Sequence, residues 1–516
     1  MNAAAWAIVA VLGLGAIALA DLRWMRVAQR EHYLPPSTLV FAKRWWTSSL
    51  VNILLITVAG ASIVLAVAVE EWCWVGALAV SAAGPIGLSY KGRTSKLAWT
   101  RRMRTTAIVT GALDVVLALG AVLLPGGWRG GAFGLLLLAQ PIVVDVALAI
   151  LAPIERRGMN RFVDQATAKL RSVSPTTVAI TGSYGKTTTK NYLRHIVAGT
   201  KSVLASPASF NNTGGLARTM NEHLTMGTEV LIAEMGTYGP GEIRSLCSWV
   251  KPDIAALVNI GPVHLERMKS LDNIVSAKRE IFESASTCVI NTDAHGLRAV
   301  ADELSAAGKR VIRVSTIDRD ADATVVTEGS GFAVIVAGEP IANVSDSSAP
   351  VSNVAGAVGL ALALSIPVEV IARRVVDLPG SDHRQSVATG ASGAVVIDNT
   401  FSSNPASAEA SLKLLAKLHH DAGGTGRTMV VTPGMVELGS AQFDENEAFA
   451  SRASTQVDEF LIVGQTNRAA LRHGATAGTT NVHCFATRVD AVEWVRANAG
   501  PGDVVLYEGD LPDHYP

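Results

Sequence analysis

The amino-acid sequence predicts an α/β chain that begins with transmembrane helices. Three observations support this fold class. Long apolar runs are concentrated at residues 1–155, and residues 178–189 read as a buried strand that leads into a glycine turn, a lysine and a helix start. From about Met159, short Val/Ile/Ala runs alternate with helix-length polar segments, which is typical of a parallel sheet covered by helices. With 516 residues, the chain is too long for one compact domain.

The N-terminal part contains apolar stretches that approach the length of a membrane-crossing helix. Basic residues follow the first and third stretches, whereas the acidic pair Glu70-Glu71 follows the second. Because Lys and Arg are retained on the cytoplasmic side, we expect a multi-pass inner-membrane protein whose catalytic part, after Arg156, is cytoplasmic. No basic residue precedes the first stretch, which argues against a cleaved signal peptide. The five expected spans are 3–20, 48–69, 72–90, 105–124 and 132–152.

Composition narrows the remaining possibilities. The net charge is zero, which gives no reason to expect a nucleic-acid partner. The four cysteines are scattered without a Cys-x-x-Cys pair, so neither a zinc ribbon nor a disulfide framework is supported. Asp114 and Asp145 fall within the apolar stretches, where an acid is either functional or close to the membrane interface.

The glycine turn after the strand at 178–181 has the features of a phosphate-binding loop. Its backbone N–H groups can approach phosphate oxygens, Lys186 supplies a positive charge, and Thr187 offers a hydroxyl to Mg²⁺ at a helix N-terminus. A full Walker A loop would have glycine where this chain has Ile180, so only a shorter form is present. The predicted nucleotide-binding residues of this loop are Gly182, Ser183, Tyr184, Gly185, Lys186, Thr187 and Thr188.

Further polar clusters follow along the chain. Glu234 ends the strand at 229–234, and His264 follows the strand at 254–259. Because ligands collect at the carboxyl ends of parallel strands, an acid beside a phosphate loop is a natural Mg²⁺ ligand. Lys278 lies on a predicted helix at 273–284, where a solvated side chain is the simpler interpretation. The loop 211–215 is rich in small residues, and it either holds a substrate or makes a turn.

Taken together, these clusters resemble the Mur ligases, the ATP-dependent amide-forming enzymes of peptidoglycan synthesis, and most closely the MurF branch, which adds D-Ala-D-Ala. The resemblance covers about residues 175–509. It implies a central ATP-binding domain at 159–378 and a Rossmann-like α/β domain at 385–516, joined by a linker at 373–385. The motifs that carry it are Thr181–Thr187, Asn211–Gly215, Glu234–Gly236, His264–Glu266, Ala277–Ile281, Asp382–Arg384, Asp398–Pro405 and Gly434–Gly439.

The resemblance also implies roles for single residues. A carboxylate would attack the γ-phosphate of ATP to give an acyl phosphate, which an amine converts to an amide. Expected catalytic residues are Lys186, His264, Lys278 and Arg384. Expected Mg²⁺ ligands are Thr187, Glu234, His264 and Lys278, the last as a carbamate. Expected ATP contacts outside the loop are Asn353, Arg384 and Asn399, and expected substrate contacts are Asn211, Asn212, Thr213 and Asn404.

Three departures from the family pattern leave the substrates open. Asn399 stands where the family has the ribose-binding Asp, and Glu508 stands where MurF has a lysine. The N-terminal domain that binds the UDP part of the substrate is replaced by apolar stretches, so the precursor is either a soluble small molecule or lipid-linked. A poly-γ-glutamate-synthetase-like ligase, a transport ATPase and a non-catalytic pseudo-ligase are the alternatives. The sequence specifies neither the carboxylate, nor the amine, nor the oligomeric state.

Overall fold

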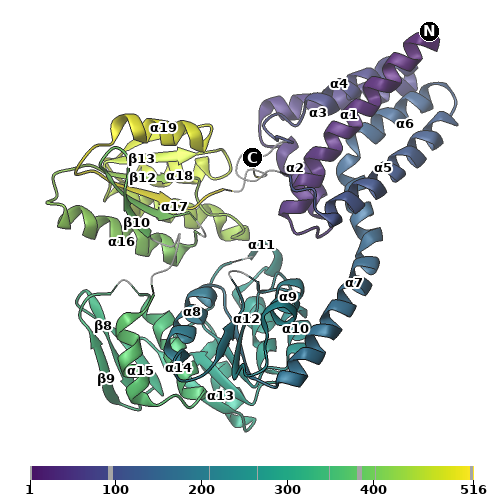
Figure 1. The fold of residues 1–516 in the computed structure, drawn as a ribbon. Coiled ribbons are helices and arrows are strands. Elements are labelled where there is room, and N and C mark those ends of the chain that lie inside the picture. The colour runs from purple at the N-terminus through teal and green to yellow at the C-terminus, as the bar shows by residue number, and fades with distance from the viewer. Residues whose placement is uncertain are drawn as a thin grey trace.

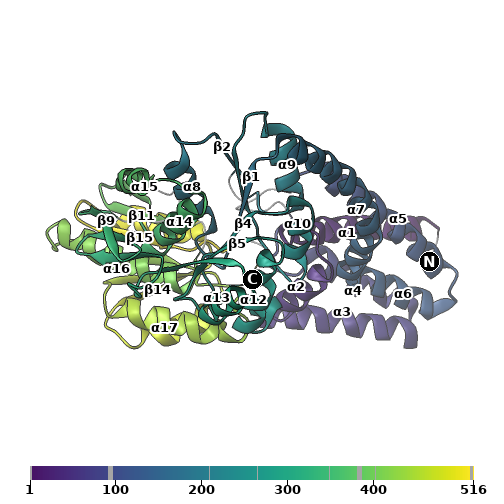
Figure 2. The same cartoon turned by 90° about the horizontal axis from the view of Figure 1, so that it is seen from below.

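The structure is a computed structural model that describes residues 3–90, 97–207, 210–263, 265–347, 349–379, 386–400, 403–511 and 515. Three parts follow one another along the chain, as the colours of Figure 1 show. A helical region comes first, a central α/β domain follows, and a second α/β domain ends the chain. The view from below in Figure 2 again shows the helical region to one side of the two α/β domains.

The helical region is built from apolar helices. The stretch 72–90 does not form the expected span, because its helix ends at Ala83 after nine residues, about 14 Å, where a bilayer core needs about 30 Å. The expected span at 132–152 is also interrupted, because a new helix begins at Gln140, with Pro141 in its first turn. The helices are α1 (Ala3–Arg30), α2 (Ser37–Trp46), α3 (Leu50–Ala68), η1 (Glu71–Trp74), α4 (Val75–Ala83), α5 (Arg101–Val122), α6 (Gly126–Leu138) and α7 (Gln140–Val173).

Within the described part of the chain, α3 and α5 are long and apolar enough to cross a membrane. The helices α6 and α7 meet at 68° and would count as a third, bent span. Asp145 is structural, since its carboxylate accepts hydrogen bonds from the backbone N–H groups of Thr38 and Leu39 at the start of α2. Asp114 accepts a hydrogen bond from the Gln140 side chain at 3.0 Å.

The helix α7 connects the helical region to the central domain (Figure 1). It has 34 residues, and its C-terminal end buries Ala166 and Leu170 against the central domain. The central domain contains β1 (Thr176–Thr181), α8 (Lys186–Val197), β2 (Val203–Ala205), α9 (Thr213–His223), β3 (Val230–Glu234), α10 (Glu242–Val250), β4 (Ile254–Leu257), α11 (Leu265–Met268), α12 (Leu271–Arg279), η2 (Glu280–Phe282), β5 (Thr287–Asn291), α13 (Leu297–Ala306), β6 (Arg310–Ser315), β7 (Ala323–Glu328), β8 (Gly331–Val336), β9 (Glu339–Val344), α14 (Val351–Ala363), α15 (Val368–Arg374) and η3 (Val375–Asp377).

The central sheet has the order β2-β3-β1-β4-β5-β6-β7-β8-β9. Its strands pair in parallel from β2 to β7, as the sequence predicts, and the hairpins β7-β8 and β8-β9 add an antiparallel edge. The strand β1 lies between β3 and β4, so the turn after β1, Glu234 and the segment after β4 all emerge at one edge. This topology brings the predicted functional residues of the central domain together.

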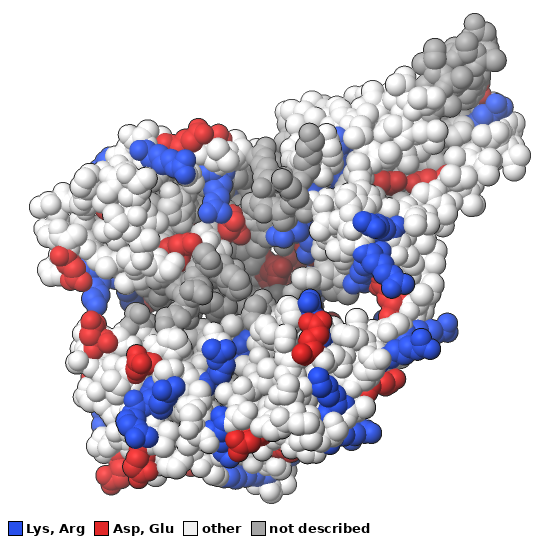
Figure 3. Space-filling view, viewed as in Figure 1, with Lys and Arg blue, Asp and Glu red and all other residues white. Residues whose placement is uncertain are grey.

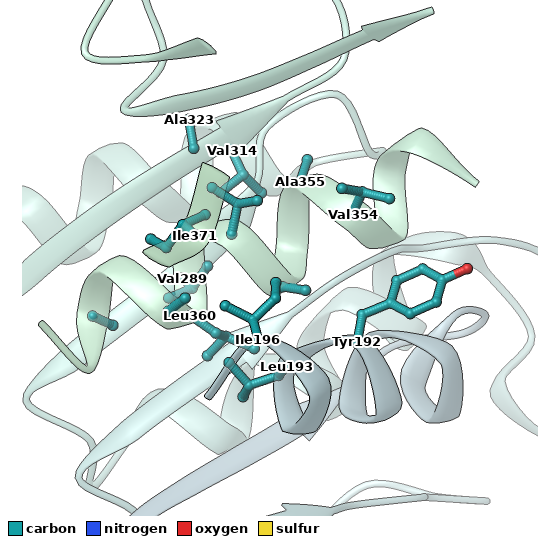
Figure 4. Packing of buried hydrophobic residues seen from close by; sticks show 14 of the residues in the cluster. Tyr192, Leu193, Ile196, Val289, Val314, Ala323, Val354, Ala355, Leu360 and Ile371 are labelled. Carbon is teal, nitrogen blue, oxygen red and sulfur yellow. The ribbon is translucent and has the colours of Figure 1, made fainter. Parts of the chain in front are cut away.

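The central domain has two core clusters, and the one beside the phosphate loop lies between the sheet and the helices α8 and α14. Figure 4 shows Leu193 and Ile196 of α8 facing Leu360 of α14, with Val289 and Val314 of the sheet beside them. The helix α14 is apolar all round, as expected for a helix buried on all sides. Burying a Leu or Ile side chain contributes about 1.5–3 kcal/mol, so this packing fixes the helix that follows the phosphate loop.

The C-terminal domain has a second sheet in the order β10-β11-β15-β12-β13-β14, parallel except for β10. The four predicted strand runs at 393–398, 428–432, 459–464 and 503–507 are all present within one or two residues. The elements are β10 (Ser386–Thr389), β11 (Val395–Asn399), α16 (Pro405–Asp421), β12 (Thr428–Thr432), η4 (Gly439–Ala441), α17 (Gln442–Ser454), β13 (Glu459–Val463), α18 (Arg468–Ala475), β14 (Asn481–Phe485), α19 (Arg488–Asn498) and β15 (Val504–Glu508).

Candidate active site

The phosphate loop connects β1 to α8, and its backbone is held by close contacts. Gly185 has φ +78°, and a Cβ there would lie 2.1 Å from Oδ1 of Asn353. Only glycine fits this position, because both the backbone angle and the space exclude a side chain. Ser183 donates its N–H to the Asn259 carbonyl at 2.9 Å and its hydroxyl to the Gly261 carbonyl at 3.1 Å. These bonds tie the loop to the segment that follows β4.

Lys186 and Tyr184 complete the loop. The Lys186 ammonium donates to the carbonyls of Gly182 at 2.7 Å and Ser183 at 3.2 Å, so it folds back over the turn. The Tyr184 ring fills the space beside Gly261, where a Cβ would lie 2.2 Å from the ring. Burial, and then the negative charge of Glu445 in the C-terminal domain, raise the pKa of Tyr184. Thr188 is buried in the first turn of α8.

Glu234 is the centre of the polar cluster beside the loop. It is 1% exposed, and its Oε2 accepts hydrogen bonds from the Thr187 hydroxyl at 2.9 Å and the Lys190 ammonium at 3.0 Å. Its Oε1 accepts from the Asn211 amide at 3.2 Å. The predicted neighbours Thr187 and Glu234 therefore do meet, and Asn211 joins them.

Sequence reasoning missed Lys190. It lies three residues after Thr187 on α8, so both side chains project from one helical face toward Glu234. That spacing was the available signal. The Lys190 and Glu234 side chains are each 2% exposed, and a buried charge of this kind requires a partner.

Lys278 is buried beneath the phosphate loop and is not the solvated lysine that its helix alone suggests. It is 4% exposed, and its Nζ donates to the Gly182 carbonyl at 3.2 Å, the same oxygen that Lys186 contacts. Burial, and then the charge of Lys186, hold the pKa of Lys278 well below its usual range. A lowered pKa favours the neutral amine, which is the form that reacts with CO₂ to give a carbamate.

The donor set fits a Mg²⁺ ion on its chemistry. Mg²⁺ takes oxygen ligands, usually one or two from protein side chains together with phosphates and water. The Thr187 hydroxyl and the Glu234 carboxylate lie 2.9 Å apart beside the phosphate loop and would supply such ligands. Within the described ranges, His, Cys, Asp and Glu side chains do not form a metal-binding group of three or more. The predicted ligand His264 lies outside the described residues, as does Arg384.

Several predicted substrate contacts have structural roles. Asn212 accepts a hydrogen bond from the Gly215 N–H and thereby caps α9, of which Thr213 is the first residue. The Asn404 side chain caps α16 by accepting a hydrogen bond from the Ser407 N–H at 3.0 Å, and the Asn404 backbone N–H donates to the Ser407 hydroxyl at 3.1 Å. Capping occupies the side-chain oxygens of Asn212 and Asn404.

The two departures from the family pattern in the C-terminal domain lie opposite each other. Asn399 on β11 pairs with Glu508 on β15, and the Asn399 amide donates to the Glu508 carboxylate at 2.9 Å. Ser403 donates to the other carboxylate oxygen at 2.6 Å. Glu508 is fully buried, and burial raises its pKa to about 6. An amide here partners the carboxylate, whereas an aspartate at position 399 would repel it.

This fold and this site define a class of protein: an ATP-binding P-loop domain joined to a second, Rossmann-like α/β domain. The family model described as the Mur ligase middle domain matches residues 180–359. The model described as the Mur ligase glutamate ligase domain matches residues 383–511. Residues 1–179 lie outside both.

The relatives of this chain include MurF enzymes. UDP-N-acetylmuramoyl-tripeptide--D-alanyl-D-alanine ligase of Mycobacterium tuberculosis is 30% identical over 409 residues, covering 72% of this chain and 79% of the relative. The Bacillus subtilis protein of the same name is 26% identical, covering 66% and 75%. MurF from Acinetobacter baumannii has the same fold with a TM-score of 0.59 and 22% identity, covering 68% of this chain and 77% of that one.

The chain belongs to the Mur ligase family. The predicted α/β fold with parallel sheets, the resemblance to MurF and the enzyme class, an ATP-dependent carboxylate–amine ligase, are thereby confirmed. ATP and Mg²⁺, which ligases of the MurF type use, are likewise confirmed as the expected cofactors.

Proposed function

We propose that the chain joins the carboxylate of a cell-wall precursor to an amino compound at the cytoplasmic face of the membrane. Residues 1–155 would form the membrane domain, 159–378 the ATP-binding domain and 385–516 the domain that binds the amine. The observation that carries this proposal is the contact of Thr187 and Glu234 beside a phosphate loop that is itself underlain by the buried Lys278.

The residues of the site would divide the work of one reaction. Lys186 would hold the transferring phosphoryl group, and Arg384 would add a second positive charge when the domains close. Thr187, Glu234, His264 and carbamylated Lys278 would hold Mg²⁺. When bound, Mg²⁺ neutralises the phosphate oxygens that would otherwise repel an approaching carboxylate. Asn211 donates a hydrogen bond to Glu234 and would thereby fix the orientation of the Glu234 carboxylate.

The chemistry then follows from the charges. The substrate carboxylate attacks the γ-phosphate, ADP leaves, and an acyl phosphate forms. The amine attacks the acyl carbon, and phosphate departs as the amide bond forms. In the relatives named above, the substrates are a UDP-N-acetylmuramoyl-tripeptide and D-alanyl-D-alanine. For this chain, the same chemistry on a muramoyl-peptide carboxylate is the proposed reaction.

The surface of the helical region supports the membrane location. Large apolar side chains on α3 and α5 are exposed, which for a soluble protein would be costly. Figure 3 shows few charged side chains along the visible face of this region. The exposed residues include Leu50, Val51, Leu54, Val58, Val64, Ile108, Val115, Val116, Leu119 and Val122.

The test uses the full chain in detergent with ATP and pairs of carboxylates and amines, glutamate included. ADP release that requires both substrates, together with a product mass equal to the two joined minus water, is the expected result. Lys186→Ala should lower the rate by about 10²-fold or more. Lys413→Ala, which removes an exposed lysine on α16, is the control and should leave it unchanged. Full ADP formation by Lys186→Ala would refute the proposal.

A further inference from the structure

The helical region contacts the segments that follow Glu234 and His264, a loop and the helix α11. His32, in the turn after α1, lies 3.0 Å from the Tyr238 hydroxyl, four residues after Glu234. Glu31 accepts a hydrogen bond from Arg267 at 2.7 Å, three residues after the position of His264. The part of the chain that replaces the usual substrate-binding domain therefore meets the catalytic edge directly.

Two adjoining cavities lie at this junction. The first has a volume of about 350 Å³ and lies between α2 and α11, and the second, of about 850 Å³, extends between α11 and the C-terminal domain. They share four lining residues, Arg44, Glu266, Lys269 and Tyr515. Together the two adjoining cavities, called the passage, extend from the helical region toward the carboxyl ends of the strands of the C-terminal sheet.

The chemistry of the lining changes along this passage. The end formed by α2 and the turn before it is apolar, with Leu34, Pro35, Val40 and Phe41. Leu34 and Val40 are 38% and 43% exposed, so they present apolar surface rather than core packing. The far cavity is lined chiefly by neutral polar groups, including Thr47, Ser48, Ser440, Gln442, Thr466 and Asn467.

The wall shared by the two cavities carries a net positive charge. Among the four shared residues, Arg44 and Lys269 supply two cations and Glu266 one anion, which leaves one positive charge; the rest of the first cavity adds one cation, Arg267, and two acids, Glu31 and Glu437, so the charges of that cavity balance. The Arg44 guanidinium is ion-paired with Glu266 and lies over the Tyr515 ring at 5.6 Å. A guanidinium has five N–H donors in a planar fork, so it can hold phosphate oxygens as well as this partner.

We infer that this passage binds a lipid-linked substrate whose apolar chain, phosphate and sugar-peptide follow one another in the same order as the lining. The apolar chain lies along α2, the phosphate group lies against Arg44 and Lys269, and the sugar-peptide fills the polar cavity. The inference rests on the proposed function and names its substrate class: a phosphoryl-lipid glycopeptide. A soluble nucleotide carrier has no group that the apolar wall formed by Leu34 and Val40 would bind.

The test compares two donors that differ only in their carrier. Both are muramoyl-peptides linked through diphosphate, one to an isoprenoid chain and one to uridine, and the full chain is assayed in detergent micelles with ATP and D-Ala-D-Ala. We expect a lower KM for the isoprenoid donor. Arg44→Gln and Val40→Asn should each raise that KM about tenfold, leaving kcat and the KM for ATP unchanged. Lys43→Gln, an exposed neighbour on α2 outside both cavities, is the charge-matched control for Arg44 and should change nothing.

The outcomes separate this inference from the proposed function. Amide formed from the uridine donor with an equal or lower KM, or an unchanged KM in Arg44→Gln and Val40→Asn, would overturn the inference and leave the proposed function standing. Amide formation from neither muramoyl donor would overturn both. An increase in KM confined to the isoprenoid donor would support both.

Discussion

Replacement of Glu234 by glutamine tests the buried ion pair at the centre of the site. The structure places the Lys190 ammonium 3.0 Å from the Glu234 carboxylate, with both side chains 2% exposed. Glu234→Gln removes the carboxylate beside the buried Lys190 ammonium, and Lys190→Met removes the ammonium beside the buried Glu234 carboxylate. Breaking a buried pair in this way costs about 3–5 kcal/mol. In the double variant no charge remains, so its cost should be well below the sum of the two single costs.

Thermal unfolding of the full chain, followed by calorimetry of the central-domain transition, measures these costs. For a domain of this size, each kcal/mol lowers the midpoint by about 2–4 °C, so a single variant should unfold roughly 10 °C below the wild type. The coupling energy of the double-mutant cycle should be about 3 kcal/mol. Single effects that add within about 0.5 kcal/mol would refute the pairing of Lys190 with Glu234.

Three further predictions concern Gly185 of the phosphate loop, Glu508 of the C-terminal domain and Lys278. Gly185→Ala should abolish ATP binding in a calorimetric titration, because φ is +78° at this position and the added methyl group would overlap Asn353. Gly199→Ala is the control, since Gly199 has φ +92° but open space around it. This variant shares only the backbone strain and should bind ATP normally. The pKa of Glu508 rises from 4.5 unfolded to about 6 folded, so stability should fall by about 2 kcal/mol as pH rises between those values. Glu508→Gln should flatten that part of a pH series of unfolding midpoints, and an unchanged slope would contradict the assignment. Lys278 should bind ¹³C-labelled CO₂ to give a carbamate resonance in NMR spectra that Lys278→Ala lacks; the same resonance in the variant would disprove the site.

Much of the central site could be predicted from the sequence, because strand ends in a parallel sheet share one edge. That rule places Glu234 beside the phosphate loop, where the structure finds it. Lys278 is different, because nothing in its helix distinguishes a buried lysine from a solvated one, and only the family resemblance pointed to it. Lys190, the partner of Glu234, was missed. Helix spacing predicts that Lys190 and Thr187 share one helical face, but it does not predict which side chain of another element that face contacts.

Elements outside the site were harder to predict. The hairpins β7-β8 and β8-β9 were not anticipated, although Gly329 and Gly338 at their turns, both with positive φ, were the available signal. Hydropathy alone predicted a membrane span at 72–90, whereas the helix ends at Ala83. Pro85 in the sequence was the signal for this helix end. The pairing of Asn399 with Glu508 needed the strand register, which the sequence does not specify.

Transfer of oxygen from the substrate to phosphate tests most directly the claim that this chain activates a carboxylate as an acyl phosphate. The full chain would be incubated with ATP, the amine and a precursor whose carboxylate carries ¹⁸O, and the released phosphate would be analysed by mass spectrometry. One ¹⁸O atom in phosphate for each amide formed is the predicted result. Amide formation with phosphate that contains no ¹⁸O would contradict it.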